Sequence, residues 1–351
     1  MKASLAGIPV PVLGIICISF MSLANAANIA LGLKEAVQFG IYMVLFAIVF
    51  LFASRHKYVS ILSAAMTVVC IGVLALSLWQ LIADGVSPYG VLRNRNVLCG
   101  LVVGLIFVSG AWMESIAGRL GTVCAMLIVA VTAMVVPSSG WVSMGMAVLV
   151  LCAIRKSRNV ALRIGAAAVL GVAASVFFFR GHFVSQLANL SWIDPNGHDI
   201  SQRYIEWYAA LNMIKENFVL GVGAGNYQLC IGKYFGLLPK LNTLEPDTQN
   251  GWLIIGSTMG MVGLCMFVWL FLGAGMQGIK SLRSGSDGKA AGLLGAAVAW
   301  GVMSIFTPVF MRETGPFVII VLGILWAMSS ESPTSSVEGK GCKVEGGGVE
   351  G

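Results

Sequence analysis

Charged residues are scarce in this sequence of 351 residues. Asp, Glu, Lys and Arg together make up 11% of it, whereas 58% of the residues are hydrophobic and the mean hydropathy is +0.88. That composition leaves too little polar surface to cover a water-soluble globule. The sequence therefore predicts an integral membrane protein.

Histidine is also scarce, with three in the chain, and no CxxC or Cys/His cluster has the spacing of metal ligands. Most of the eight cysteines lie inside hydrophobic runs, where we expect them to pack as small apolar residues. We expect no metal and no other cofactor. The formal charge of +7 does not indicate a nucleic-acid partner, because the basic residues are scattered between hydrophobic runs.

Hydrophobic runs of helix length recur along the chain. The run ILSAAMTVVCIGVLALSLW (61–79) is apolar on all sides, as in a membrane-spanning helix, whereas a barrel needs short alternating segments. We predict an all-α fold, a polytopic membrane helix bundle of about ten transmembrane helices with one large periplasmic loop that carries an amphipathic helix. The predicted spans are residues 8–30, 36–53, 58–83, 96–113, 119–137, 140–154, 160–179, 251–278, 290–310 and 315–330.

The positions of Lys and Arg predict the orientation. With a cytoplasmic N-terminus, every inside connection carries Lys or Arg, as the positive-inside rule requires. This predicts a multi-pass membrane protein with both termini in the cytoplasm, which in a bacterium would lie in the inner membrane. The organisation is then N-terminal transmembrane helices in 1–179, a periplasmic loop in 180–250, C-terminal transmembrane helices in 251–330 and a disordered cytoplasmic tail in 331–351. The first run ends in Ala24-Asn25-Ala26, which resembles a signal-peptidase site, so cleavage there stays open.

Residues 201–216 predict an amphipathic helix at the membrane surface, where aromatic side chains suit the headgroup zone. The stretch NFVLGVGAGNYQ (217–228) follows, and its three glycines favour a tight turn whose backbone amides approach an anionic headgroup. A dinucleotide site is excluded, because a loop between spans supplies no buried strand. For the helix over 201–216, the alternative is a structural brace at the membrane surface without a chemical role. The apolar face of that helix would carry Tyr204, Trp207, Tyr208, Leu211 and Ile214.

The pattern around this helix resembles a known family. Arg203 and Trp207, then ALNMIKENFVLGVGAGNYQ (210–228) and DTQNGWLIIGSTMGMVGL (247–264), are similar to the superfamily of O-antigen ligases and O-antigen polymerases, which are bacterial polytopic membrane glycosyltransferases. Those proteins typically have an arginine that opens a helix, a G-x-G-x-x-x-[FY] turn, and a His-Asn or similar pair that starts a helix with a G-x-x-G segment. The likeness extends to SPYGVLRNRNVLCGLVVG (87–104) and PSSGWVSMGMAVLV (137–150).

Two departures bear on the activity. Gln249-Asn250 stands where ligases usually have His-Asn, and Ser139 stands at a usual arginine position. The missing histidine favours a polymerase over a ligase. The resemblance then implies transfer of a growing glycan from undecaprenyl diphosphate to an incoming lipid-linked repeat unit at the periplasmic membrane face. A ligase that uses another acceptor, and a non-enzymatic transporter, are the alternatives.

The implied partners are an undecaprenyl-diphosphate-linked oligosaccharide, membrane lipid and other proteins of polysaccharide export or chain-length control. Departure of a lipid diphosphate builds negative charge, which the arginine fork stabilises best. We therefore predict that Arg203 is catalytic, with Asp247 as the base for the acceptor hydroxyl. The predicted substrate-binding residues are Arg93, Arg95, Arg312, Gln249, Asn250 and Trp207. For the arginines the alternative is snorkelling at the membrane boundary, and for Asp247 it is an ordinary position before a helix.

Overall fold

The computed structural model describes residues 7–53, 56–84, 95–154, 158–178, 198–235, 249–284, 289–310 and 313–328. Within these ranges the chain forms eleven α-helices and two short 3-10 helices, with no strand. Five helices are long and apolar enough to cross a membrane, and four shorter apolar helices accompany them. The prediction of an all-helical membrane protein is confirmed.

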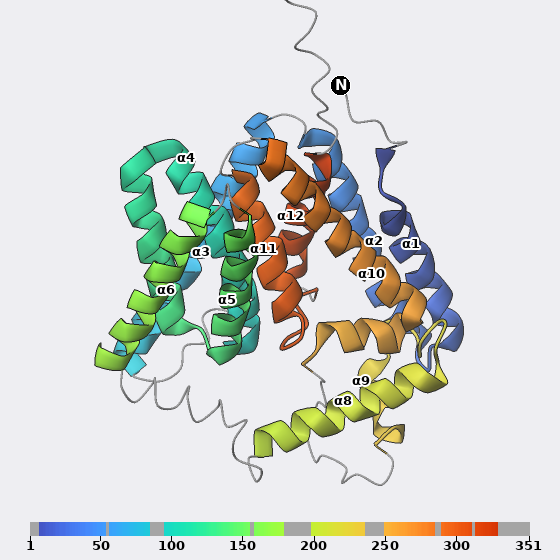
Figure 1. The fold of residues 1–351 in the computed structure, drawn as a ribbon. Helices are drawn as coiled ribbons and strands as arrows, with labels where there is room; N and C mark the ends of the chain where they lie inside the picture. Colours follow the sequence, from blue (N-terminus) through green and yellow to red (C-terminus); the bar gives the residue numbers. More distant parts are fainter. Residues whose placement is uncertain are drawn as a thin grey trace, which may run out of the picture.

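The N-terminal half is a series of antiparallel helices (Figure 1). The first predicted span, 8–30, extends too far, because a new helix begins within it. Asn28 caps that new helix by accepting a hydrogen bond from the backbone N–H of Leu31 at 3.2 Å. The helices are α1 (Val10–Met21), η2 (Ser22–Asn25), α2 (Ile29–Phe52), α3 (His56–Asp84), α4 (Arg95–Val135), α5 (Ser138–Ala153) and α6 (Arg158–Phe178).

Helix α4 doubles back on itself at one end of the bundle (Figure 1). Gly118 has φ 51° and ψ −120°, which interrupts the helix between two arms. The arms turn so tightly that a Cβ at Gly121 would lie 2.0 Å from the carbonyl oxygen of Met113. The break falls between the predicted spans 96–113 and 119–137, so each arm corresponds to one predicted span.

The C-terminal half contains α8 (His198–Glu216), α9 (Tyr227–Cys230), η4 (Ile231–Lys233), α10 (Gly251–Ser284), α11 (Lys289–Met303) and α12 (Gly315–Ala327). The span predicted over 251–278 lies in α10, which is long and apolar enough to cross a membrane, but Gly260 (φ 68°, ψ −176°) breaks this helix into two segments. The short first segment lies across one end of the bundle, and the long second segment runs through it (Figure 1). Helix α8 crosses the same end, which we call the α8 end.

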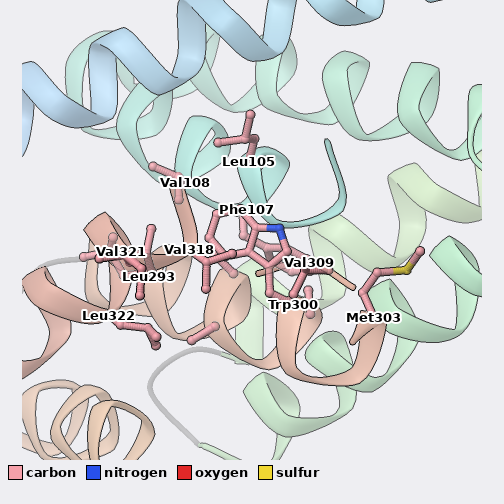
Figure 2. Packing of buried hydrophobic residues seen from close by; sticks show 14 of the residues in the cluster. Leu105, Phe107, Val108, Leu293, Trp300, Met303, Val309, Val318, Val321 and Leu322 are labelled. Carbon is pink, nitrogen blue, oxygen red and sulfur yellow. The ribbon is translucent and has the colours of Figure 1, made fainter. Parts of the chain in front are cut away.

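A core of buried side chains joins α4 and α11. The ring of Trp300 is fully buried, and its Nε1 donates to the carbonyl oxygen of Gly100 at 2.7 Å. A Cβ at Gly104 would lie 2.2 Å from that ring, so the glycine allows the two helices to approach. Figure 2 shows apolar side chains of α4, α11 and α12 around Trp300, among them Phe107 and Val318. The start of α4 is therefore packed closely against α11.

Candidate functional site

The glycine turn that follows α8 clamps the break in α10. The backbone N–H groups of Val222 and Gly223 donate to the carbonyl oxygens of Ser257 and Thr258 at 2.9 and 3.0 Å. On the other side of the break, the N–H of Met261 donates to the carbonyl oxygen of Phe218 at 2.7 Å. The turn thereby satisfies backbone groups that the interruption would leave without partners.

Two further amides of this turn are also engaged. Gly221 N–H donates to Asn217 within the turn, and Ala224 N–H donates to the hydroxyl of Ser22 at 3.1 Å. The side chain of Asn226 is fully buried and holds the start of α2 through its oxygen, which accepts from the N–H of Asn28 at 2.7 Å. The expectation that this turn offers its amides to an anionic headgroup is therefore wrong for residues 221–224.

Helix α8 has two apolar faces instead of the single one that we predicted. Ala209, Ala210 and Met213 are buried against the first segment of α10, where the hydroxyl of Ser257 donates to the carbonyl oxygen of Ala210 at 3.3 Å. Ile214 joins this buried face, at 8% exposure. Tyr204, Tyr208 and Leu211 lie on the exposed face, and Trp207 is half-buried between the two. The small alanines explain the difference, because they allow α8 to pack closely on α10.

The α8 helix begins at His198, so Arg203 lies in its second turn and does not open the helix as predicted. The structure does not describe the Arg203 side chain. Helix α8 packs on the first segment of α10 and on η4. The predicted catalytic role of Arg203 stays a prediction.

A side-chain hydrogen bond joins two segments that the sequence pattern singled out. The Nδ2 of Asn96, in the first turn of α4, donates to the Oε1 of Gln249, just before α10, at 3.1 Å. Sequence reasoning selected Gln249 but missed Asn96. Asn96 belongs to the stretch VLRNRN (91–96), which the family resemblance singled out, but only the two arginines of that stretch were selected because of their charge.

The first turn of α10 is held by three further bonds. The Oδ1 of Asn250 accepts from the N–H of Leu253 at 3.1 Å, so this predicted substrate-binding residue is also the helix cap. Gly251 N–H donates to the carbonyl oxygen of Ser304 at 2.7 Å, and the Trp252 indole donates to that of Gly301 at 3.0 Å. The start of α10 is thus tied to the end of α11.

The connection after α11 completes this arrangement. A Cβ at Gly100 would meet Thr307, Val309 and Thr314 at 3.2 to 3.8 Å, so residues on both sides of 311–312 lie against the start of α4. The start of α5 lies there too, because a Cβ at Gly140 would be 2.7 Å from the Sγ of Cys99. We call the starts of α4 and α10, with the connection after α11, the α4/α10 junction.

The predicted site residues are distributed as follows. Gln249 and Asn250 lie at the α4/α10 junction, and Arg95 begins α4 beside Asn96, although its side chain is not described. Trp207 lies on α8. Arg93, Asp247 and Arg312 lie outside the described residues. Among the residues that are described, no three His, Cys, Asp or Glu side chains come together as they would around a metal ion.

Comparison with known proteins gives one family and no curated relative. No curated protein matches the chain. The family model that matches is described as O-Antigen ligase, and its members are membrane enzymes of polysaccharide synthesis, ligases or polymerases that act on lipid-linked glycans. The matched stretch runs from the second arm of α4 through α8 and the glycine turn into α10. Residues 124–268 are an O-antigen ligase family domain.

Proposed function

We propose that this protein is a glycan polymerase. It transfers a growing glycan from undecaprenyl diphosphate to an incoming lipid-linked repeat unit at the outer face of the bacterial inner membrane. The acceptor hydroxyl attacks the anomeric carbon of the donor, the bond between that carbon and the phosphate oxygen breaks, and undecaprenyl diphosphate leaves. Asp247 takes the proton of the hydroxyl, while Arg203, Arg93, Arg95 and Arg312 stabilise the charge that gathers on the diphosphate.

One observation carries the proposal. Segments that are far apart in the chain meet at the α4/α10 junction, where the Nδ2 of Asn96 lies 3.1 Å from the Oε1 of Gln249 and the Gly251 N–H binds Ser304. Arg95 begins α4 at this junction, and the connection that contains Arg312 has its described flanks against Gly100. A diphosphate bound there would meet polar side chains from several helices, as a charged group at a membrane boundary requires.

The remaining choice is between a polymerase, a ligase and a transporter. Gln249 stands where ligases of this family usually have histidine, which favours the polymerase. A transporter is expected to show an internal repeat with charges deep inside the membrane. Arg163 and Glu114 form an ion pair in the described part of the chain, and their side chains are 46% and 37% exposed, so this pair does not lie deep inside the bundle. We therefore rank the transporter last.

The surface polysaccharide of a deletion strain tests the proposal. A polymerase predicts that long chains disappear while single repeat units still reach the outer-membrane acceptor. Accumulation of lipid-linked polymer would instead identify a ligase. An unchanged glycan with altered uptake of a solute would indicate a transporter and refute both enzymes. Purified protein with lipid-linked repeat units provides the second test, because a polymerase lengthens them without any other acceptor.

A further inference from the structure

Gln249 has an unusual backbone conformation. Its φ is 46°, and it is the one non-glycine residue with positive φ in the part of the chain that the structure describes. L-residues with a side chain rarely adopt this region unless their surroundings hold them there. Gln249 is held from two sides. The Asn96 side chain binds its side chain, and the two residues that follow it, Asn250 and Gly251, make hydrogen bonds to Leu253 and Ser304.

The bond from Asn96 determines which end of the Gln249 carboxamide is engaged. The Nδ2 of Asn96 is a donor, so it pairs with the oxygen of Gln249. The carboxamide is planar, and its nitrogen lies on the opposite side from its oxygen. Gln249 is half-buried, so the residue is partly accessible from outside the protein. With its oxygen engaged by α4, Gln249 presents two N–H donors to whatever binds at the junction.

We propose that Asn96 is a positioning residue that orients Gln249 to donate hydrogen bonds to the oxygens of a lipid-linked glycan. This inference rests on the proposed function. Both the diphosphate and the sugar hydroxyls offer oxygen acceptors, and an outward carboxamide oxygen would repel the diphosphate. Asn96 acts through Gln249.

Two substitutions separate orientation from mere attachment. Asn96→Asp replaces the donor with an acceptor, so Gln249 turns its N–H groups toward α4 and its oxygen outward. The contact between the helices is kept, but its direction is reversed. Asn96→Ala removes the contact, so the Gln249 carboxamide rotates freely and still presents its donors part of the time. Ser139→Asp, in the first turn of the neighbouring α5, is the control for added negative charge.

The measurement is polymerisation of lipid-linked repeat units by the purified variants, together with their thermal unfolding in detergent. We expect Asn96→Asp to lower kcat/KM about tenfold or more, the effect of one lost hydrogen bond to a charged group, while its unfolding temperature stays near that of the unsubstituted protein. Asn96→Ala should lower activity less and the unfolding temperature more. Ser139→Asp should lower activity less than Asn96→Asp. The opposite order, with Asn96→Ala the less active variant, would show that Asn96 only attaches α4 to α10.

Gln249→Glu identifies the acceptor. The carboxylate still accepts from Asn96, but it presents an oxygen where Gln249 presents N–H groups. If the acceptor is the diphosphate, this variant binds undecaprenyl diphosphate more weakly. If the acceptor is a sugar hydroxyl, that binding is unchanged while polymerisation falls, and both results support the inference. Activity equal to that of the unsubstituted protein would overturn it. A purified unsubstituted protein that neither polymerises repeat units nor binds undecaprenyl diphosphate would overturn the proposed function itself.

Discussion

Replacement of Gly260 by alanine should destabilise the protein strongly, because two independent constraints act at this residue. Its backbone has φ 68° and ψ −176°, a region that essentially only glycine occupies. A Cβ there would also lie 2.1 Å from the carbonyl oxygen of Val219 and 2.3 Å from its carbonyl carbon. Real Cβ atoms do not approach backbone atoms so closely, so the glycine turn or α10 has to move.

The magnitude follows from these two terms. The forced conformation costs roughly 1–3 kcal/mol, and the displacement needed to relieve the overlap costs roughly another 1–3 kcal/mol. That displacement also weakens the bond from Met261 N–H to Phe218, which is 2.7 Å long. Gly260→Ala should therefore lower the free energy of unfolding by roughly 2–6 kcal/mol.

Gly275→Ala is the matched control, because it makes the same change in the same helix. No heavy atom lies within 4 Å of the position that its Cβ would take. Alanine at a permissive helical position is stabilising by about 0.5–1 kcal/mol. Thermal unfolding of the purified proteins in one detergent should show a clear decrease for Gly260→Ala and none for Gly275→Ala. Equal unfolding temperatures for the two variants would refute the clamp that we describe between the glycine turn and the break in α10.

Three further predictions concern the proposed reaction. Arg203→Lys should shorten the glycan chains as severely as Arg203→Ala, at normal abundance in the membrane, because lysine lacks the bidentate fork; full-length chains from the lysine variant would remove Arg203 from the mechanism. A cysteine introduced at Asn196 should react with a membrane-impermeant reagent in intact cells. Cys230 should give little background, because burial raises the pKa of that thiol and nearby Lys233 offsets only part of the effect. Labelling that requires lysed cells would show that the proposed orientation is inverted. Polymerisation should continue in excess chelator, and activity that returns only with a divalent ion would contradict charge stabilisation by arginine.

Most of the helices could be predicted from the sequence, because lipid allows few alternatives for a long apolar run. The break at Gly260 could not. A glycine inside an apolar run looks the same whether the helix continues or stops, since glycine is common in membrane helices. What decides is the turn around Phe218 and Val222, which supplies hydrogen bonds to both sides of the break. Those bonds come from a segment some forty residues earlier in the chain, beyond the reach of local patterns.

The sequence identified some residues of the candidate site by their type, but it did not predict which of them contact one another. Charge requirements singled out arginines, and likeness to a family singled out Gln249 and Asn250. The pairing of Asn96 with Gln249 links positions 153 residues apart. It depends on how α4 packs against α11, where the buried Trp300 donates to Gly100. The stretch VLRNRN marked the segment, but nothing in the sequence around Asn96 reports that packing, so its pairing with Gln249 could only be found in three dimensions.

The glycine turn has a functional consequence although its amides at residues 221–224 bind other parts of the protein. If α10 were continuous, its first segment, Gly251 to Met259, would extend along the axis of the second segment by about 13 Å. The break at Gly260 turns this segment across the α8 end instead (Figure 1). In that direction the start of α10 reaches Asn96 and Ser304. The turn therefore acts on the α4/α10 junction at a distance, because it holds the break that brings Gln249 to α4.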